Sequence, residues 1–178
     1  MNKTEYSIWQ KHTHYVRSNI LSQVAILEME MKELLSIRFS NSIDDIKKFK
    51  RIFLETNRLP FNALIELYKQ YLNEYEPEWM EKNKDFLQIV NELKELRNEF
   101  AHGINPMLDE VSEIEISNAP SIMLLLNKKG DVIIKKYSNQ EITKLVGRID
   151  KLIMHLHTQR KMIVGDKMDP AKFGQLLD

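Results

Sequence analysis

Three polar side chains suited to proton transfer and phosphate binding occur close together in the sequence: Arg97, Asn98 and His102. An imidazole, with an ordinary pKa near ~6.5, takes up and releases protons at neutral pH. A guanidinium presents a planar fork of N–H donors that matches phosphate oxygens. These residue types therefore indicate chemistry on a phosphate ester, provided that the fold brings them together.

The segment before His102 has the pattern of an amphipathic helix. On a wheel of about 100° per residue, four apolar residues share one stripe about 40° to either side of the first: Phe86, Val90, Leu93 and Phe100. Arg97 falls in the same stripe, where an unpaired charge would cost several kcal/mol. Asn98 and His102 are four apart, hence neighbours on a second face. The structural alternative is an Arg–Glu ion pair and a hydrogen-bonded histidine.

The segment Glu95-Leu-Arg-Asn-Glu-Phe-Ala-His-Gly103 resembles the R-N-x-x-x-H motif of the HEPN superfamily (higher eukaryotes and prokaryotes nucleotide-binding domains). Many members of this superfamily are RNases of toxin–antitoxin and antiphage systems. The layout is also similar, since the motif closes a long amphipathic helix in a helix-rich chain without cysteine. The likeness in layout covers most of residues 1–160, and the specific match is confined to the motif.

The resemblance implies that Arg97 and His102 are the catalytic pair and that Asn98 orients them or the phosphate. His102 would deprotonate a ribose 2′-hydroxyl for attack on the adjacent phosphate, and Arg97 would stabilise the growing negative charge. The expected products are a 2′,3′-cyclic phosphate and a 5′-hydroxyl. The resemblance thus predicts a metal-independent endoribonuclease that needs no cofactor and does not cleave DNA.

The spacing of the pair sets a geometric condition. On an ideal helix Arg97 and His102 differ by about 140°, so they do not share a face. Either the helix distorts near Gly103, or the two side chains meet across a two-fold axis. HEPN nucleases typically form dimers whose motifs face one cleft, which favours the homodimer.

Helix-breaking residues divide the first hundred residues into four expected helices, with interruptions at 41–42, 57–60 and 76–77. The fourth should run from Pro77 to Gly103. Apolar residues of the first repeat at helical spacing: Trp9, Val16, Ile20, Val24, Leu27, Met31 and Leu34. The expected buried side of the second helix carries Ile46, Phe49 and Phe53. The expected buried side of the third helix carries Leu64, Leu67, Tyr68, Tyr71 and Leu72.

After Gly103 the pattern changes to short strands at 111–116, 121–126 and 131–137, with a turn at 127–130. The capping-box pattern of Ser138 to Glu141 begins a last amphipathic helix. These elements predict a mostly α fold: an elongated, HEPN-like bundle of about five helices with a small β-hairpin or three-stranded sheet before the last helix. We expect one domain over 1–164 and a tail or arm over 165–178.

Lysine plus arginine and aspartate plus glutamate are balanced at 26 each, so RNA contacts must come from local patches. The densest basic segment contains Lys47, Lys48 and Arg51, which could follow an RNA backbone or form an ordinary solvated face. The histidine pairs 12/14 and 155/157 point about 200° apart on a helix, so no metal site is expected. No apolar leader or span of about 18 apolar residues occurs, which predicts a cytoplasmic protein without a membrane partner.

Three interpretations remain open. The first is an RNase that acts as a toxin or antiphage effector, with RNA as substrate and an antitoxin partner such as a nucleotidyltransferase. The second is a catalytically inactive HEPN-fold dimer that serves as a regulator or scaffold, similar to the mannitol-repressor-like branch. The third is a generic helical bundle with a chance motif. The joint presence of arginine, asparagine and histidine favours the first, and the balanced charge favours the second.

Overall fold

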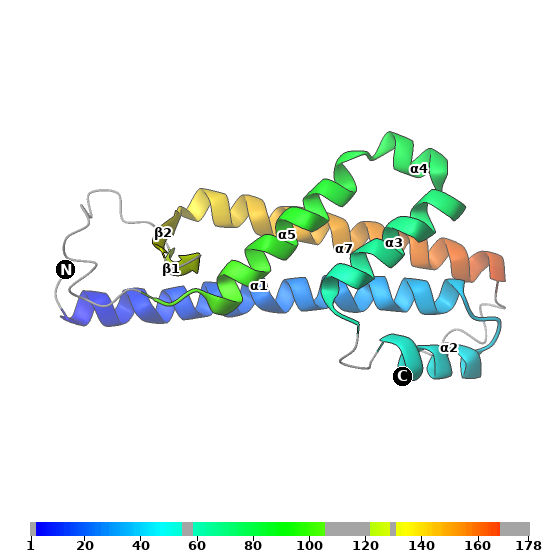
Figure 1. Cartoon of the computed structure of the whole chain (residues 1–178), viewed down its shortest axis with the longest axis horizontal. Helices are drawn as coiled ribbons and strands as arrows, with labels where there is room; N and C mark the ends of the chain where they lie inside the picture. The colour runs from blue at the N-terminus through cyan, green and yellow to red at the C-terminus, as the bar shows by residue number, and fades with distance from the viewer. Residues whose placement is uncertain (1–2, 55–58, 106–121, 129–130, 168–178) are drawn as a thin grey trace. The chain divides into compact units, whose positions relative to one another are not determined.

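The computed structural model describes residues 3–54, 59–105, 122–128 and 131–167, and the protein is mostly helical (Figure 1). Its helices are α1 (Lys3–Arg38), α2 (Ile43–Phe49), α3 (Phe61–Tyr75), α4 (Pro77–Lys82), α5 (Asp85–His102) and α7 (Asn139–Lys167). A π-helical turn, η1 (Lys50–Leu54), continues α2 directly. Strands β1 (Ile122–Lys128) and β2 (Asp131–Tyr137) pair antiparallel, with Ile122 opposite Tyr137 and Lys128 opposite Asp131.

The chain forms two compact units. The first comprises Met1–Val24 and Glu95–Ile149, and the second comprises Ala25–Lys94 and Asp150–Asp178. Apolar residues buried in the first unit include Ile20, Val24, Phe100, Leu124, Leu126, Leu145 and Ile149. Those of the second include Leu27, Met31, Leu34, Leu64, Tyr68, Tyr71, Leu72, Val90, Leu93 and Leu156. The motif, β1 and β2 all belong to the first unit.

The start of α7 follows the capping-box pattern. The Ser138 backbone N–H donates to Glu141 Oε2 over 2.7 Å, and the Glu141 N–H donates to Ser138 Oγ over 3.2 Å. This satisfies donors that a helix start leaves without partners. At its other end α7 continues through Gly165 to Lys167, so the tail expected from residue 165 does not begin there. Residues 168–178 and the strand expected at 111–116 lie outside the described residues.

The expectation of one helix from Pro77 to Gly103 is wrong, because α4 ends at Lys82 and α5 begins at Asp85. Asn83 interrupts the helix with φ −126° and ψ 47°. Its side-chain Nδ2 donates to the Trp79 carbonyl over 2.9 Å. Asparagine has a low helix propensity, which favours a break at this residue.

Two residues expected in the core are exposed. Phe53 is 58% exposed because it lies in η1, whose i→i+5 hydrogen bonds widen the turn and change the direction of the side chains that follow. Leu67 is 41% exposed. Phe61 and Ile65 are buried on α3 and shift the centre of its apolar stripe away from Leu67.

Candidate functional site

The three motif residues lie on the last two turns of α5. Arg97 and Asn98 are half-buried, whereas His102 is exposed. Arg97 Nη1 donates to Asn98 Oδ1 over 3.4 Å, which is long for a hydrogen bond. Within the described residues Arg97 forms no ion pair, and His102 forms neither an ion pair nor a hydrogen bond. The Arg–Glu pair that would give Arg97 a structural role is therefore not formed in this part of the chain.

The end of α5 has regular geometry. The α-helix extends through His102, and the Gly103 N–H donates to the Glu99 carbonyl over 2.7 Å in the same i→i−4 pattern. The first of the two expected solutions, a helix distorted near Gly103, is therefore not present. On such a helix Arg97 and His102 point about 140° apart. One copy of α5 does not direct both side chains at the same phosphate.

Glu99 is the buried charged residue of this segment, at 9% exposure. Its carboxylate accepts hydrogen bonds from two residues of β2, Lys135 Nζ at 2.5 Å and Tyr137 Oη at 2.7 Å. Burial raises the pKa of the Tyr137 phenol, and the hydrogen bond and charge of Glu99 raise it further. These contacts join the helix turn that carries Asn98 to β2.

Helix α1 contributes two further polar side chains close to the helix end. Arg17 Nη2 donates to the Ala101 carbonyl over 2.9 Å, satisfying one of the last carbonyls of α5. His14 Nε2 lies 3.3 Å from Asn105 Nδ2. The contacts fall on either side of His102 in sequence. The sequence did not place either residue near the motif, although their spacing of three puts them on one helix face.

Comparison with family models, curated proteins and solved structures finds no match for this chain. The likeness to HEPN proteins therefore stays a prediction that depends on the motif and on the layout of the helices. Among the described helices, none combines the length and the apolar character that crossing a membrane requires.

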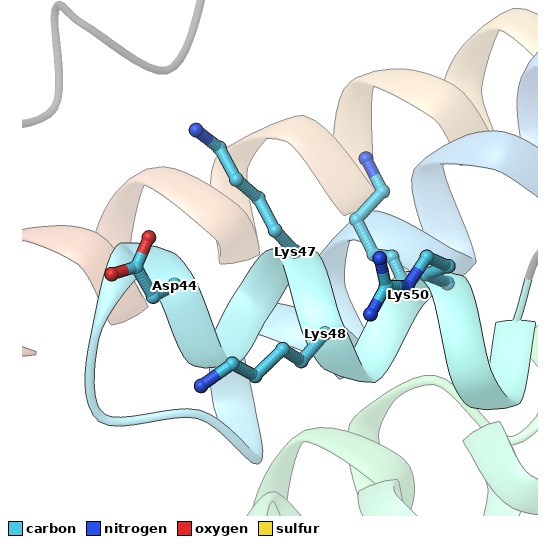
Figure 2. A pocket seen from close by; sticks show the side chains of 5 residues that line it. Asp44, Lys47, Lys48 and Lys50 are labelled. Atoms are coloured by element: carbon cyan, nitrogen blue, oxygen red, sulfur yellow. The ribbon is translucent and has the colours of Figure 1, made fainter.

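The basic residues Lys47, Lys48 and Arg51 lie in the second unit, on α2 and η1. Together with Asp44 and Lys50 they line a hollow of about 410 Å³ (Figure 2). We call these five residues the basic pocket. It belongs to a different compact unit from the motif.

Two other histidines have structural partners in the second unit. His157 Nδ1 lies 3.0 Å from Glu30 Oε2, and Arg160 Nη1 lies 3.2 Å from the same oxygen. His155 stacks on Trp79 with ring centroids 4.0 Å apart, and burial lowers the pKa of its imidazole. Within the described residues His102 is exposed and has no such partner, and the same holds for His12.

Gly103 permits a close approach between the end of α5 and β1. A Cβ at this position would lie 2.7 Å from the Glu99 carbonyl oxygen, 3.1 Å from Leu124 Cβ and 3.2 Å from Leu126 Cδ2. The first contact is with backbone, which cannot rotate away. That backbone belongs to α5 itself, and the other two contacts are with side chains of β1, so a larger residue would crowd both the helix end and β1.

We expect Gly103→Ala to lower the free energy of unfolding by about 1–3 kcal/mol, because the added methyl group overpacks this contact. The control is Gly147→Ala in α7, where a Cβ meets nothing within 4 Å and alanine should stabilise the helix by about 0.5–1 kcal/mol. Urea unfolding of both variants measures the difference. Equal stabilities would show that the close approach at Gly103 does not constrain the helix end.

Proposed function

We propose that this protein is a metal-independent endoribonuclease whose reacting groups are Arg97 and His102. The proposal depends most on one observation: in the described residues these two side chains carry no ion pair, and His102 is exposed without any hydrogen bond. A buried charge would need a structural partner, and the buried charge of this turn is Glu99 instead. Arg97 and His102 are therefore available to bind and react with a substrate.

The reaction that these groups support is transesterification of RNA. The neutral imidazole of His102 takes the proton of a ribose 2′-hydroxyl, and the resulting oxygen attacks the neighbouring phosphorus. A bond from the 2′-oxygen to phosphorus forms, the bond from phosphorus to the 5′-oxygen breaks, and water protonates the departing oxygen. Arg97 stabilises the negative charge that increases on the phosphoryl oxygens. Asn98, next to Arg97, orients the guanidinium or the phosphate.

We further propose that the complete site forms in a homodimer, in which Arg97 of one copy and His102 of the other face the same phosphate. The regular helix end supports this arrangement, because it leaves the two side chains of one copy on different faces. The first unit also exposes large apolar side chains close in sequence to the polar residues of the site. Tyr15 is 72% exposed and Ile104 is 68% exposed. Burying such residues favours association.

The fold that we propose is a HEPN-like helical bundle, and the biological role is that of a toxin or antiphage effector in the cytoplasm. The support is the motif on a helix end followed by another long amphipathic helix, α7. An antitoxin, such as a nucleotidyltransferase, would then be the natural partner. The alternative, an inactive dimeric regulator or scaffold, is favoured by the equal numbers of acidic and basic residues.

Purified protein distinguishes these functions when it is incubated with an unstructured RNA oligonucleotide in the presence of EDTA. We expect cleavage that leaves a 2′,3′-cyclic phosphate and a 5′-hydroxyl. An oligonucleotide with a single ribose should be cut only after that ribose, and the all-deoxy strand should stay intact. Mass spectrometry of the fragments identifies the termini. Cleavage of the all-deoxy strand would contradict 2′-hydroxyl attack, and intact RNA would favour the scaffold.

A further inference from the structure

The basic pocket has an excess of positive charge. Among the described residues that line it, four are cations, Lys47, Lys48, Lys50 and Arg51, and one is a carboxylate, Asp44. Lys50 also forms an ion pair with Glu33. Within the described residues the other three cations form no ion pair. Among the described residues, these four cations outnumber the carboxylates of Asp44 and Glu33, which gives this part of the surface a positive field.

The backbone at this hollow is unusual. α2 ends at Phe49 and passes directly into the π-helical turn η1, which carries Lys50 and Arg51. π-Helical turns are rare in proteins. The turn also leaves Ile52 and Phe53 exposed at 55% and 58%. An ordinary solvated helix face would explain the lysines, but it would explain neither the π-helical turn nor the exposed apolar residues.

The directions of the side chains indicate the shape of the ligand. In Figure 2 the amino groups of Lys47 and Lys48 extend away from each other, on different sides of the helix. Both lysines are exposed, so their charges do not converge on one small anion. A chain of phosphates spaced along a polymer can meet each of them in turn. An exposed aromatic such as Phe53 offers a stacking face for unpaired bases, which are present in single-stranded RNA.

We propose that the basic pocket binds the sugar–phosphate backbone of single-stranded RNA, through Lys47, Lys48 and Arg51. This inference rests on the proposed function, because it assigns to the same RNA substrate a binding surface in the second unit, outside the motif. The pocket then contributes to affinity and leaves the chemical step to Arg97 and His102. Phosphate contacts of this kind carry no sequence preference and weaken as salt displaces them.

The test measures RNA binding without cleavage, in full-length protein carrying His102→Ala. The probe is a labelled, unstructured single-stranded RNA, and its Kd is measured at several salt concentrations. The test variant adds Lys47→Ser, Lys48→Ser and Arg51→Ser. The control instead adds serine at three exposed lysines elsewhere in the second unit, Lys69, Lys84 and Lys161, for the same loss of charge.

We expect the test variant to bind RNA about tenfold or more weakly at low salt. The slope of log K against log salt should fall by about 2, since each phosphate contact to a single strand contributes about 0.7. The control should stay near the starting value. The proposal is overturned if both variants lose affinity equally, if neither does, or if the starting protein does not bind RNA. It is also overturned if the three pocket substitutions weaken the binding of tripolyphosphate, a small polyanion, but leave the binding of RNA unchanged.

The same proteins separate this inference from the proposed function. If the protein binds RNA through the basic pocket but never cleaves RNA, the pocket is an RNA-binding site and the proposed nuclease activity is wrong. If the wild-type protein cleaves RNA but the three substitutions do not weaken RNA binding, the nuclease activity is supported and the proposed RNA-binding role of the pocket is wrong. With His102 intact, the triple variant should show a raised KM and a kcat within about twofold of wild type, because the lost contacts bind substrate and transition state alike.

Discussion

Replacing His102 by alanine should lower the rate of RNA cleavage about 10²- to 10⁴-fold, the usual contribution of a positioned general base. The substitution should leave the free energy of unfolding nearly unchanged. His102 is exposed and forms no hydrogen bond with the described residues, so its removal opens no cavity and leaves no buried partner. Initial cleavage rates and urea unfolding curves measure the two quantities on the same preparation.

His12→Ala is the matched control, since His12 is also an exposed helical histidine. It should retain wild-type cleavage. The pH dependence gives a second check, because the neutral imidazole is the active form of a general base. The wild-type rate should rise with pH, and the small residual rate of His102→Ala should lose the part of this rise that a general base contributes. If His102→Ala cleaves RNA at half the wild-type rate or faster, His102 is not the general base.

Arg97→Ala should reduce cleavage about 10²- to 10³-fold, comparable with the loss of one donor that stabilises a transition state. Arg97→Lys should recover only a small part of the activity, because an ammonium keeps the charge but lacks the planar fork. Neither change should destabilise the fold strongly. Within the described residues no carboxylate pairs with Arg97, so none is left buried without a partner.

Lys136→Ala controls for the loss of a positive charge in the same unit, since Lys136 is an exposed residue of β2. It should retain near wild-type cleavage. If Arg97→Ala instead lowers the unfolding free energy by several kcal/mol and leaves the activity of the folded fraction unchanged, Arg97 has a structural role and the proposed mechanism fails.

Local patterns in the sequence were enough to predict much of the molecule. The apolar stripe of Phe86, Val90, Leu93 and Phe100 is buried throughout α5, at 5% exposure or less. The capping box at Ser138 begins α7, and the segment 131–137 is a strand over its full length. These features depend on neighbours within a few residues, which is the range over which helical and strand periodicity acts.

Features that depend on distant contacts or on local competition could not be predicted. Glu99 meets Lys135 and Tyr137 across 36 and 38 residues, and nothing in the sequence near Glu99 indicates that pair. The sequence also suggested that the buried charge would be Arg97, whereas Glu99 is the buried one. The break at Asn83 and the π-helical turn η1 each affect only a few residues, and the spacing of apolar residues does not mark them.

A mixed dimer tests most directly whether two copies of the chain share each reacting site. Arg97→Ala and His102→Ala chains with different affinity tags are expressed together, and the dimer that carries both tags is purified. One of its two sites then has an intact Arg97 from one copy and an intact His102 from the other. We predict about half of the wild-type cleavage rate from the mixed dimer, while each parent dimer stays nearly inactive. A mixed dimer as inactive as its parents would contradict the shared site.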